Sequence, residues 1–326
     1  MQTIAHYNIL ERLGTGALGD VYRARDLKVG RTVALMQVPQ ELLEPPDGSN
    51  NREGFLRQAR AAQTLNHPNI ASLFDVVEQD GRCYLAYEFA AGPSLRDEMG
   101  GRPVNLRRAI ELAAQIGDAL AEGHSRGLVH GDLRPDNIVI TPKGSPKILN
   151  YGLTAWTTSG QARTAAASAD GVGSDPHGVA GYLSPEQAVG SSIDARSDVF
   201  SFGVLLYEML TGRNPFTGAT PAATVMNVIR LTPPVPSSAM PSAPPELDAL
   251  INRALTKPVE SRAAGILALS SDLRRIGSAL DAKERDIEVP QLPRGRQAPS
   301  SSGSRGWILG LVVLVILAAV WWYLSQ

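Results

Sequence analysis

The sequence predicts an α+β protein in which a small sheet lobe precedes a larger helical lobe. Short runs of alternating apolar and polar residues dominate residues 7–90, helical periodicity takes over from Ser94, and no internal repeat interrupts either pattern. Of the 326 residues, 43% are hydrophobic, which is enough to bury a full core. We therefore expect a globular chain with an N-terminal lobe at 7–90 and a C-terminal lobe at 91–280.

The first lobe is predicted to hold five strands and one helix. The helix covers residues 53–65 and ends before Asn66-His67-Pro68, because a residue that precedes proline is disfavoured in the helical region. The strands, each alternating with a period of two, are expected at 7–13, 19–25, 32–38, 72–79 and 82–89.

The second lobe is predicted to be helical throughout. The proline- and serine-rich residues 232–245 are too short for a domain linker and are expected to form a surface loop. Apolar residues recur with helical spacing in 106–126, 197–211, 221–231, 245–255 and 264–280.

The C-terminal residues 307–324 form an uncharged run of eighteen residues, which as a helix spans roughly 27 Å. A buried core helix is the alternative, but we expect a single-pass transmembrane helix. Arginines precede the run and none follows it, which indicates a cytoplasmic domain on the cell (inner) membrane, with no extracellular domain beyond. Residues 281–306 are rich in Pro, Ser, Gly and Arg, which predicts a flexible tether, and residues 1–7 lack a secretory signal.

Charge and cysteine content exclude several function classes. A net charge of -1 gives no footprint for nucleic acid, so no nucleic-acid partner is expected. The single cysteine, Cys83, rules out an intramolecular disulfide framework and a cysteine-based metal site.

A glycine-rich segment, residues 13–21, lies between two predicted strands rather than between a strand and a helix. This context argues against a Rossmann dinucleotide site. In a strand-loop-strand, the backbone amides around Gly14, Gly16 and Gly19 can lie over phosphates while Val21 covers a flat base. A glycine-rich hairpin without ligand has the same sequence, so this segment alone decides nothing.

Six further motifs follow the glycine-rich segment in a fixed order. They are Val33-Ala34-Leu35-Met36, Tyr87-Glu88-Phe89, His130 to Asn137, Asn150-Tyr151-Gly152, Ser184-Pro185-Glu186, and Asp194 to Gly203. In this order the chain resembles a bacterial serine/threonine protein kinase over about residues 7–280. The resemblance implies a bilobal protein-kinase-like fold and a nucleotide site formed by Leu13, Gly14, Gly16, Gly19, Val21, Ala34, Met36, Glu88 and Phe89.

Four positions that match the family's motifs have lost the family's chemistry. Met36 replaces the strand lysine that holds the α- and β-phosphates, and Gln58 replaces the glutamate that pairs with that lysine. Asn150 replaces the aspartate that binds magnesium, and a neutral amide is a weaker ligand for a hard dication. Val179 replaces the threonine whose hydroxyl bonds to the catalytic loop.

Other positions keep the family's chemistry or come close to it. Asp132 matches the catalytic base, Asn137 the second magnesium ligand, and Arg134 the catalytic-loop lysine. Asp132 and Asn137 can equally serve to hydrogen-bond the loop backbone. Asn137 and Asn150 are thus the only metal-ligand candidates, and weak ones. Gly131 replaces the arginine that pairs with a phosphorylated loop, so that switch is expected to be absent.

The remaining candidate site residues are interpreted as structural, or their role is left open. Glu186 and Arg262 match a buried ion pair, and Asp198 matches the aspartate that holds the catalytic loop. Arg23 shares a strand face with Val21 but is read as a solvated strand residue. Residues 153–176 are read as a loop without fixed structure, with Thr157, Thr158, Thr164 and Ser168 as candidate phosphate acceptors.

Two functions remain open. The first is a membrane-tethered pseudokinase that works by binding a protein partner, an active kinase or its substrate, with ATP and Mg²⁺ or Mn²⁺ bound weakly or not at all. The second is a low-activity kinase that transfers the γ-phosphate of ATP to protein serine or threonine. The oligomeric state is left open.

Overall fold

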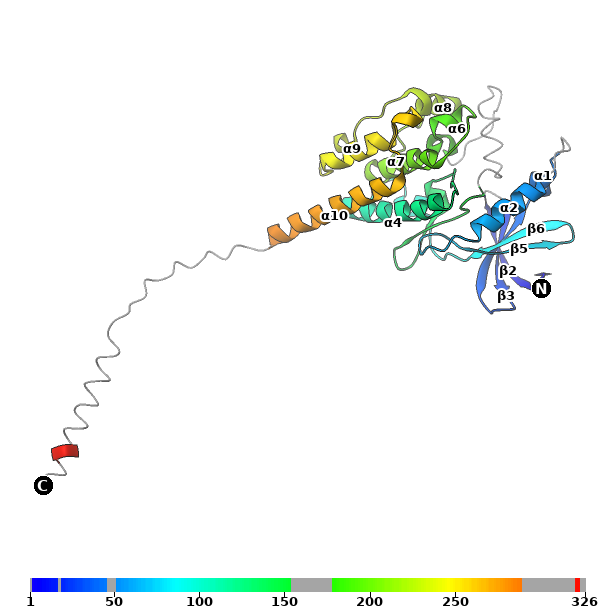
Figure 1. Cartoon of the computed structure of the whole chain (residues 1–326), viewed down its shortest axis with the longest axis horizontal. Coiled ribbons are helices and arrows are strands. Elements are labelled where there is room, and N and C mark those ends of the chain that lie inside the picture. The colour runs from blue at the N-terminus through cyan, green and yellow to red at the C-terminus, as the bar shows by residue number, and fades with distance from the viewer. Residues whose placement is uncertain (1, 17–18, 46–50, 154–177, 289–319, 323–326) are drawn as a thin grey trace. The chain divides into compact units, whose positions relative to one another are not determined.

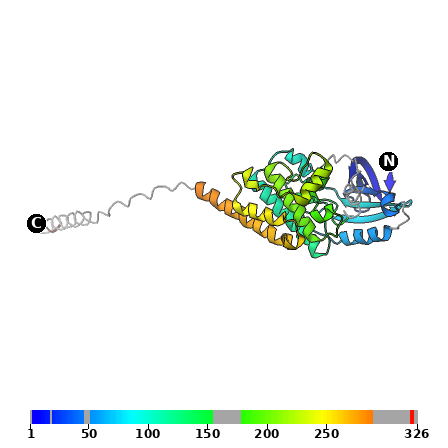
Figure 2. The ribbon, with the colours of Figure 1, turned by 90° about the horizontal axis from the view of Figure 1, so that it is seen from above.

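The computed structural model describes residues 2–16, 19–45, 51–153, 178–288 and 320–322 (Figure 1). The predicted order of a sheet lobe followed by a helical lobe is confirmed, and Figure 2 shows the blue sheet lobe beside the green and yellow helices. The six-stranded antiparallel sheet has the order β1-β2-β3-β4-β6-β5. Its strands are β1 (Thr3–Ile4), β2 (Tyr7–Gly16), β3 (Gly19–Asp26), β4 (Thr32–Val38), β5 (Leu73–Gln79) and β6 (Arg82–Glu88).

Both faces of the central strand β4 pack against apolar clusters. In β4, Val33 and Leu35 join an apolar cluster with Tyr7 on one face. Met36 and Val38 point to the opposite face, where they join Phe55 of α2 (Arg52–Ala62) and the short helix α1 (Gln40–Leu43). The two-residue strand β1 was not predicted, because an element of two residues carries no periodicity.

The helical lobe is built around α7 (Ala195–Thr211), in which every residue from Ser197 to Leu210 is buried. The Asp194 side chain caps its first turn by accepting from the Arg196 amide, and Gly212 ends it in the left-handed region. The other helices are α3 (Leu95–Met99), α4 (Leu106–Ser125), α6 (Pro185–Ala188), α8 (Pro221–Arg230), α9 (Pro245–Ala254) and α10 (Ile266–Glu288).

Short elements complete this lobe. A two-stranded sheet of β7 (Ile138–Ile140) and β8 (Pro146–Ile148) follows the short 3₁₀ turn η1 (Pro135–Asn137). Three more 3₁₀ turns are η3 (Val179–Tyr182), η4 (Pro236–Ser238) and η5 (Val259–Ser261). Helix α10 runs past residue 280, so the first residues of the segment predicted as a tether are helical.

Several predicted features lie outside the described residues. These are the tether from residue 289, the apolar run at 307–324 except for residues 320–322, and the candidate acceptors Thr157, Thr158, Thr164 and Ser168. Within the described ranges, no helix combines the length and the apolar character needed to cross a membrane.

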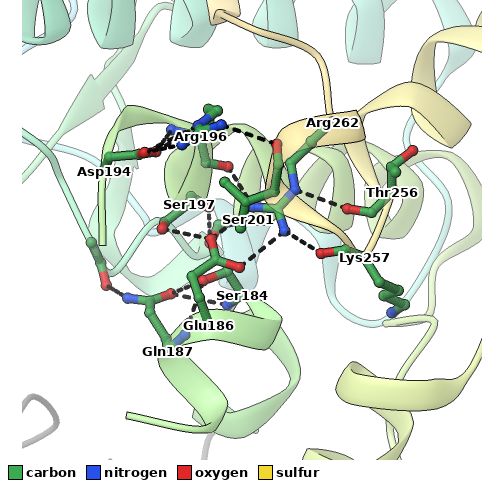
Figure 3. A network of polar contacts seen from close by, with 12 residues as sticks. Ser184, Glu186, Gln187, Asp194, Arg196, Ser197, Ser201, Thr256, Lys257 and Arg262 are labelled. Atoms are coloured by element: carbon green, nitrogen blue, oxygen red, sulfur yellow. Dashed lines mark hydrogen bonds and ion pairs between the residues drawn. The ribbon is translucent and has the colours of Figure 1, made fainter. Parts of the chain in front are cut away.

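A buried ion pair joins α6 to the segment between η5 and α10 (Figure 3). Arg262 donates to Glu186 through Nη1 at 2.7 Å and Nη2 at 3.0 Å, and Ser197 donates to the same carboxylate at 2.7 Å. Burial by itself would raise the pKa of Glu186, but the bonds from Arg262 and Ser197 outweigh it and hold that pKa below its usual range. The remaining Arg262 donors reach the carbonyls of Arg196, Thr256 and Lys257, so the guanidinium is fully satisfied.

Removing one member of this pair should be costly. Arg262→Ala leaves the Glu186 carboxylate buried without its partner, and we expect the free energy of unfolding to fall by about 3–5 kcal/mol. Urea denaturation of the full-length chain measures this difference. Arg57→Ala is the control, because Arg57 forms an exposed i,i+4 pair with Glu53 whose loss should cost under about 0.5 kcal/mol. Equal losses in the two variants would contradict the structural role of Arg262.

Candidate functional site

A cavity of about 570 Å³ lies between the sheet lobe and the helical lobe, and most of the predicted site residues line it. Leu13 and Val21 come from the glycine-rich hairpin, and Ala34 and Met36 come from β4. The remaining lining residues are Thr15, Ala71, Tyr87, Glu88, Phe89, Ala90, Arg134, Asp136, Asn137, Val139, Leu149 and Asn150. Gly14, Gly16, Gly19, Gln58, Asp132 and Val179 are not among the lining residues.

The glycine-rich hairpin is held in an extended form by its own backbone. Gly16 pairs with Gly19 at its tip, and Gly14 and Gly19 both have positive φ angles. A Cβ atom at Gly19 would lie 2.0 Å from the Gln37 carbonyl oxygen, so no larger residue fits between β3 and β4 there. Arg23 pairs with Glu11 at 3.0 Å on the exposed surface of these strands, which agrees with its reading as a solvated residue.

Met36 is buried in apolar surroundings, although it also lines the cavity. Its side chain is 5% exposed and belongs to a cluster with Phe55 and Leu153. Gln58 on α2 donates through its amide nitrogen to the Gly152 carbonyl at 2.5 Å. Met36 thus packs the inner wall of the cavity, and Gln58 fastens α2 to the segment after Asn150.

The loop that carries the polar cavity residues is held from below by Asp198. This fully buried carboxylate accepts from the backbone amides of His130 and Gly131, each at 2.7 Å, and from His124 Nε2 at 2.8 Å. Gly131 has φ +75°, a value that favours glycine over the arginine of the family's motif. The Gln187 side chain donates to the Gly131 carbonyl at 2.7 Å.

Sequence reasoning missed the tie from Gln187 to the loop. The only local signal is the capping box that Gln187 forms with Ser184 at the start of α6. This bond anchors the loop to α6, which follows Val179 of η3, the position where the family uses a threonine hydroxyl. The loop is therefore held in place without that hydroxyl.

Asp132, Arg134 and Asn137 are brought together at the floor of the cavity. The Asn137 side-chain amide donates to the Asp132 backbone carbonyl at 2.8 Å and to its carboxylate at 2.9 Å. Arg134 Nε lies 3.8 Å from the Asp132 carboxylate, which is near enough for charge attraction but too far for a hydrogen bond. Asn150 adopts φ +58°, a left-handed conformation that asparagine tolerates better than most residues.

These residues fit a magnesium ion poorly. A hard dication prefers carboxylate oxygens, and here Asn137 and Asn150 offer only neutral amide oxygens, while the lining carboxylates Asp136 and Glu88 are engaged by Arg96 and Lys147. The side-chain nitrogen of Asn137 already donates a hydrogen bond to the Asp132 carboxylate. Among the residues that the structure describes, no group of three His, Cys, Asp or Glu side chains could hold a metal ion.

A second polar network borders the cavity, and the sequence did not predict it either. Arg96 of α3 donates to Asp136 at 2.9 Å and to the Tyr182 hydroxyl at 3.0 Å, and lies 3.6 Å from Glu208. Burial raises the pKa of Glu208, although bonds from Tyr182 and Arg96 oppose the shift. Asp136 and Tyr182 are 40 and 86 positions away from Arg96 in the sequence, and Glu208 is farther still, so no local pattern could reveal the network.

Comparisons with known proteins agree with this geometry. The profile of the protein kinase domain family matches residues 7–272. Serine/threonine-protein kinase PknB of Mycolicibacterium smegmatis is 33% identical over 96% of this chain and 53% of its own length. Serine/threonine-protein kinase pkn3 of Myxococcus xanthus is 34% identical over 92% of this chain and 54% of its own length. The chain therefore spans about half the length of these curated relatives.

A solved structure shares the fold. The kinase domain of Mycobacterium tuberculosis PknI superposes with a TM-score of 0.65 at 22% identity, covering 84% of this chain and 97% of that one. At this level of identity the likeness supports the fold alone.

The neutral pair Met36 and Gln58 yields a prediction about stability. Met36→Lys places an ammonium in apolar surroundings, and Gln58→Glu turns a donor into a carboxylate facing the Gly152 carbonyl. We expect each single variant to lose about 1–3 kcal/mol of unfolding free energy, and the double variant to recover at least about 1 kcal/mol through a new ion pair.

Urea denaturation of the four proteins in this double-mutant cycle measures the coupling. Met226→Lys is the matched control, because Met226 is 41% exposed and a lysine there should change little. Additive losses in the cycle would show that positions 36 and 58 do not face each other.

Proposed function

Because this chain belongs to the protein kinase family, we propose that its kinase domain is a pseudokinase, which works by binding a protein partner and not by transferring phosphate. The observation that carries the proposal is the burial of Met36 among apolar side chains, at the position where kinases place the lysine that holds the α- and β-phosphates. A thioether offers neither a cation nor a donor there.

Two further positions support the same conclusion. The amide of Gln58 is engaged with the Gly152 carbonyl, so the ion pair of active kinases is missing on both sides. Asn150 brings a neutral amide to the magnesium position. Removing one preorganised electrostatic contact typically costs about 10²–10³ in rate, and although such losses do not add simply, several together approach abolition.

A second function is favoured by different observations. The relatives named above are called serine/threonine-protein kinases, and this favours phosphotransfer to protein serine or threonine over the pseudokinase reading. Asp132 and Asn137 also stay in hydrogen-bond contact on a loop that Asp198 holds rigidly. A residual kinase of low activity is therefore the alternative.

We also propose that the domain is tethered to the inner membrane. The uncharged run at 307–324, preceded by arginines, supports a single span with the kinase domain on the cytoplasmic side. An active kinase or a substrate of one is the partner class that a catalytically impaired kinase domain at the membrane would serve.

A phosphotransfer assay separates the two functions. We expect the full-length chain, given ATP with Mg²⁺ or Mn²⁺ and a serine/threonine peptide library, to incorporate no more phosphate than its Asp132→Asn variant. The physical reason is the loss of charge at Met36, Gln58 and Asn150. Labelling that depends on Asp132 would establish the kinase function and overturn the pseudokinase proposal.

A charge-restored variant serves as the positive control in the same assay. Met36→Lys, Gln58→Glu and Asn150→Asp together should raise the affinity for ATP and for the metal by about tenfold or more. If neither affinity rises, the lost charges are not what limits the site.

A further inference from the structure

Three exposed cations lie on neighbouring turns of the helical lobe and form a cationic face. They are Arg102 in the turn before α4, Lys143 in the turn between β7 and β8, and Arg213 in the turn after α7. None of the three side chains has a hydrogen bond or an ion pair with another residue of the described ranges. We propose that this cationic face docks on the anionic headgroups of the membrane that tethers the chain.

The fold brings the three turns together. A Cβ atom at Gly212 would lie 3.0 Å from the Arg102 carbonyl carbon, so the turn with Arg213 packs against the turn before α4. The turn between β7 and β8 reaches the same region, because Arg108 in the first turn of α4 donates to the Gly144 carbonyl at 2.5 Å. Backbone packing therefore fixes the positions of all three cations.

Acidic side chains near this face leave its positive charge in excess. Asp281 forms an ion pair with Arg107, and Glu98 lies 3.8 Å from Arg108, so these two carboxylates already have cationic partners. Glu111, one turn beyond Arg107 on α4, is exposed as well. The three unpaired cations outnumber this one acid, and the excess charge is complementary to an anionic surface.

The cationic face lies where the chain leaves the domain. Helix α10 packs antiparallel to α4, since Ser270 donates to the Ala114 carbonyl at 3.3 Å while Asp281 pairs with Arg107 near the start of α4 (Figure 1). Asp281 thus lies beside the first turn of α4, which follows the turn that carries Arg102. Residues 282–306 lead from this point to the uncharged run at 307–324, the proposed membrane span.

A weak attraction is enough for a tethered domain. The cytoplasmic leaflet is anionic, and each Lys or Arg near such a surface strengthens binding by about fivefold, so three unpaired cations contribute about a hundredfold. A short linker also gives an effective concentration on the order of millimolar. Because the whole chain has a net charge of -1, the attraction comes from this face and not from the overall charge.

A second set of exposed cations provides a matched control. Arg25, Lys28 and Arg82 lie in the sheet lobe, and their side chains also lack a partner among the described residues. The sheet lobe and the C-terminal end of α10 are at opposite ends of the domain in both views (Figure 1, Figure 2). These residues therefore have the same charge as the cationic face but lie far from the point where the chain leaves the domain.

This inference rests on the membrane tether of the proposed function. It adds which face of the kinase domain meets the lipid.

Lysine footprinting of the full-length chain tests the inference. The chain is reconstituted in nanodiscs of phosphatidylcholine alone, and in nanodiscs of equal parts phosphatidylcholine and phosphatidylglycerol, and is then labelled with acetic anhydride. We expect labelling of Lys143, measured by mass spectrometry relative to Lys28, to fall by about threefold or more in the anionic discs. The difference should vanish at about 1 M salt, where the screening length is about 3 Å. Equal labelling ratios in the two kinds of disc overturn the inference.

Two double variants assign the contact while keeping both reporter lysines. Arg102→Gln with Arg213→Gln should return the labelling of Lys143 in anionic discs to its level in neutral discs. Arg25→Gln with Arg82→Gln removes the same charge from the sheet lobe and should leave the protection of Lys143 unchanged. Because all four arginines are exposed and unpaired, neither double variant should lower the melting temperature. Equal loss of protection in the two double variants overturns the inference, since it would show a response to net charge alone.

The proposals fail separately. A chain that enters neither kind of disc refutes the tether, and this inference with it. A chain that enters both discs with equal labelling of Lys143 refutes the cationic face and leaves the tether intact. Phosphotransfer that depends on Asp132 refutes the pseudokinase and leaves both membrane proposals as measured.

Discussion

The buried carboxylate of Asp198 is the constraint on which the site depends. It accepts hydrogen bonds from the backbone amides of His130 and Gly131 and from His124 Nε2. One side chain of the central helix α7 therefore fixes the loop that carries Asp132, Arg134 and Asn137. An unpaired carboxylate at such depth would be costly, and three donors remove that cost. The floor of the cleft is thereby anchored to α7, whatever charges line the cleft above it.

In this domain, the packing around the cleft is kept at positions where the charged side chains of the family are missing. Met36 fills space that an alkyl-ammonium chain would fill, and the amide of Gln58 replaces a salt bridge with a bond to the Gly152 backbone. Gln187 anchors the catalytic loop near the position where a threonine hydroxyl is missing. Met36 and Gln58 preserve packing and hydrogen bonding at positions where the family carries charges, so the fold stays intact without those charges.

The sequence predicts the long strands and helices and the motifs that follow a fixed order. It does not predict hydrogen bonds between residues that are far apart in the chain. Strands β2 to β6 follow from alternation and α7 from its apolar run, whereas β7, β8 and the five-residue α3 are too short for a period to register. The order of motifs located Met36, Asn137 and Asn150 at one cavity. The bonds of Gln58 to Gly152 and of Arg96 to Asp136 join residues 94 and 40 positions apart, and only tertiary packing brings them together.

The charged side chains that remain in the cleft then determine how strongly it can attract a polyanion. Two unit charges 4 Å apart interact by about 4 kcal/mol at an effective dielectric constant near 20, so each missing partner matters on the scale of a whole binding energy. In the family, a metal-bound triphosphate is held with a strand lysine and an aspartate that binds the metal, and positions 36 and 150 supply neither charge. Among the described residues that line the cleft, Arg134 is the one cation that remains, and it lies 3.8 Å from the Asp132 carboxylate. The positive charge that the family places on the strand is therefore not replaced by another described residue of the lining.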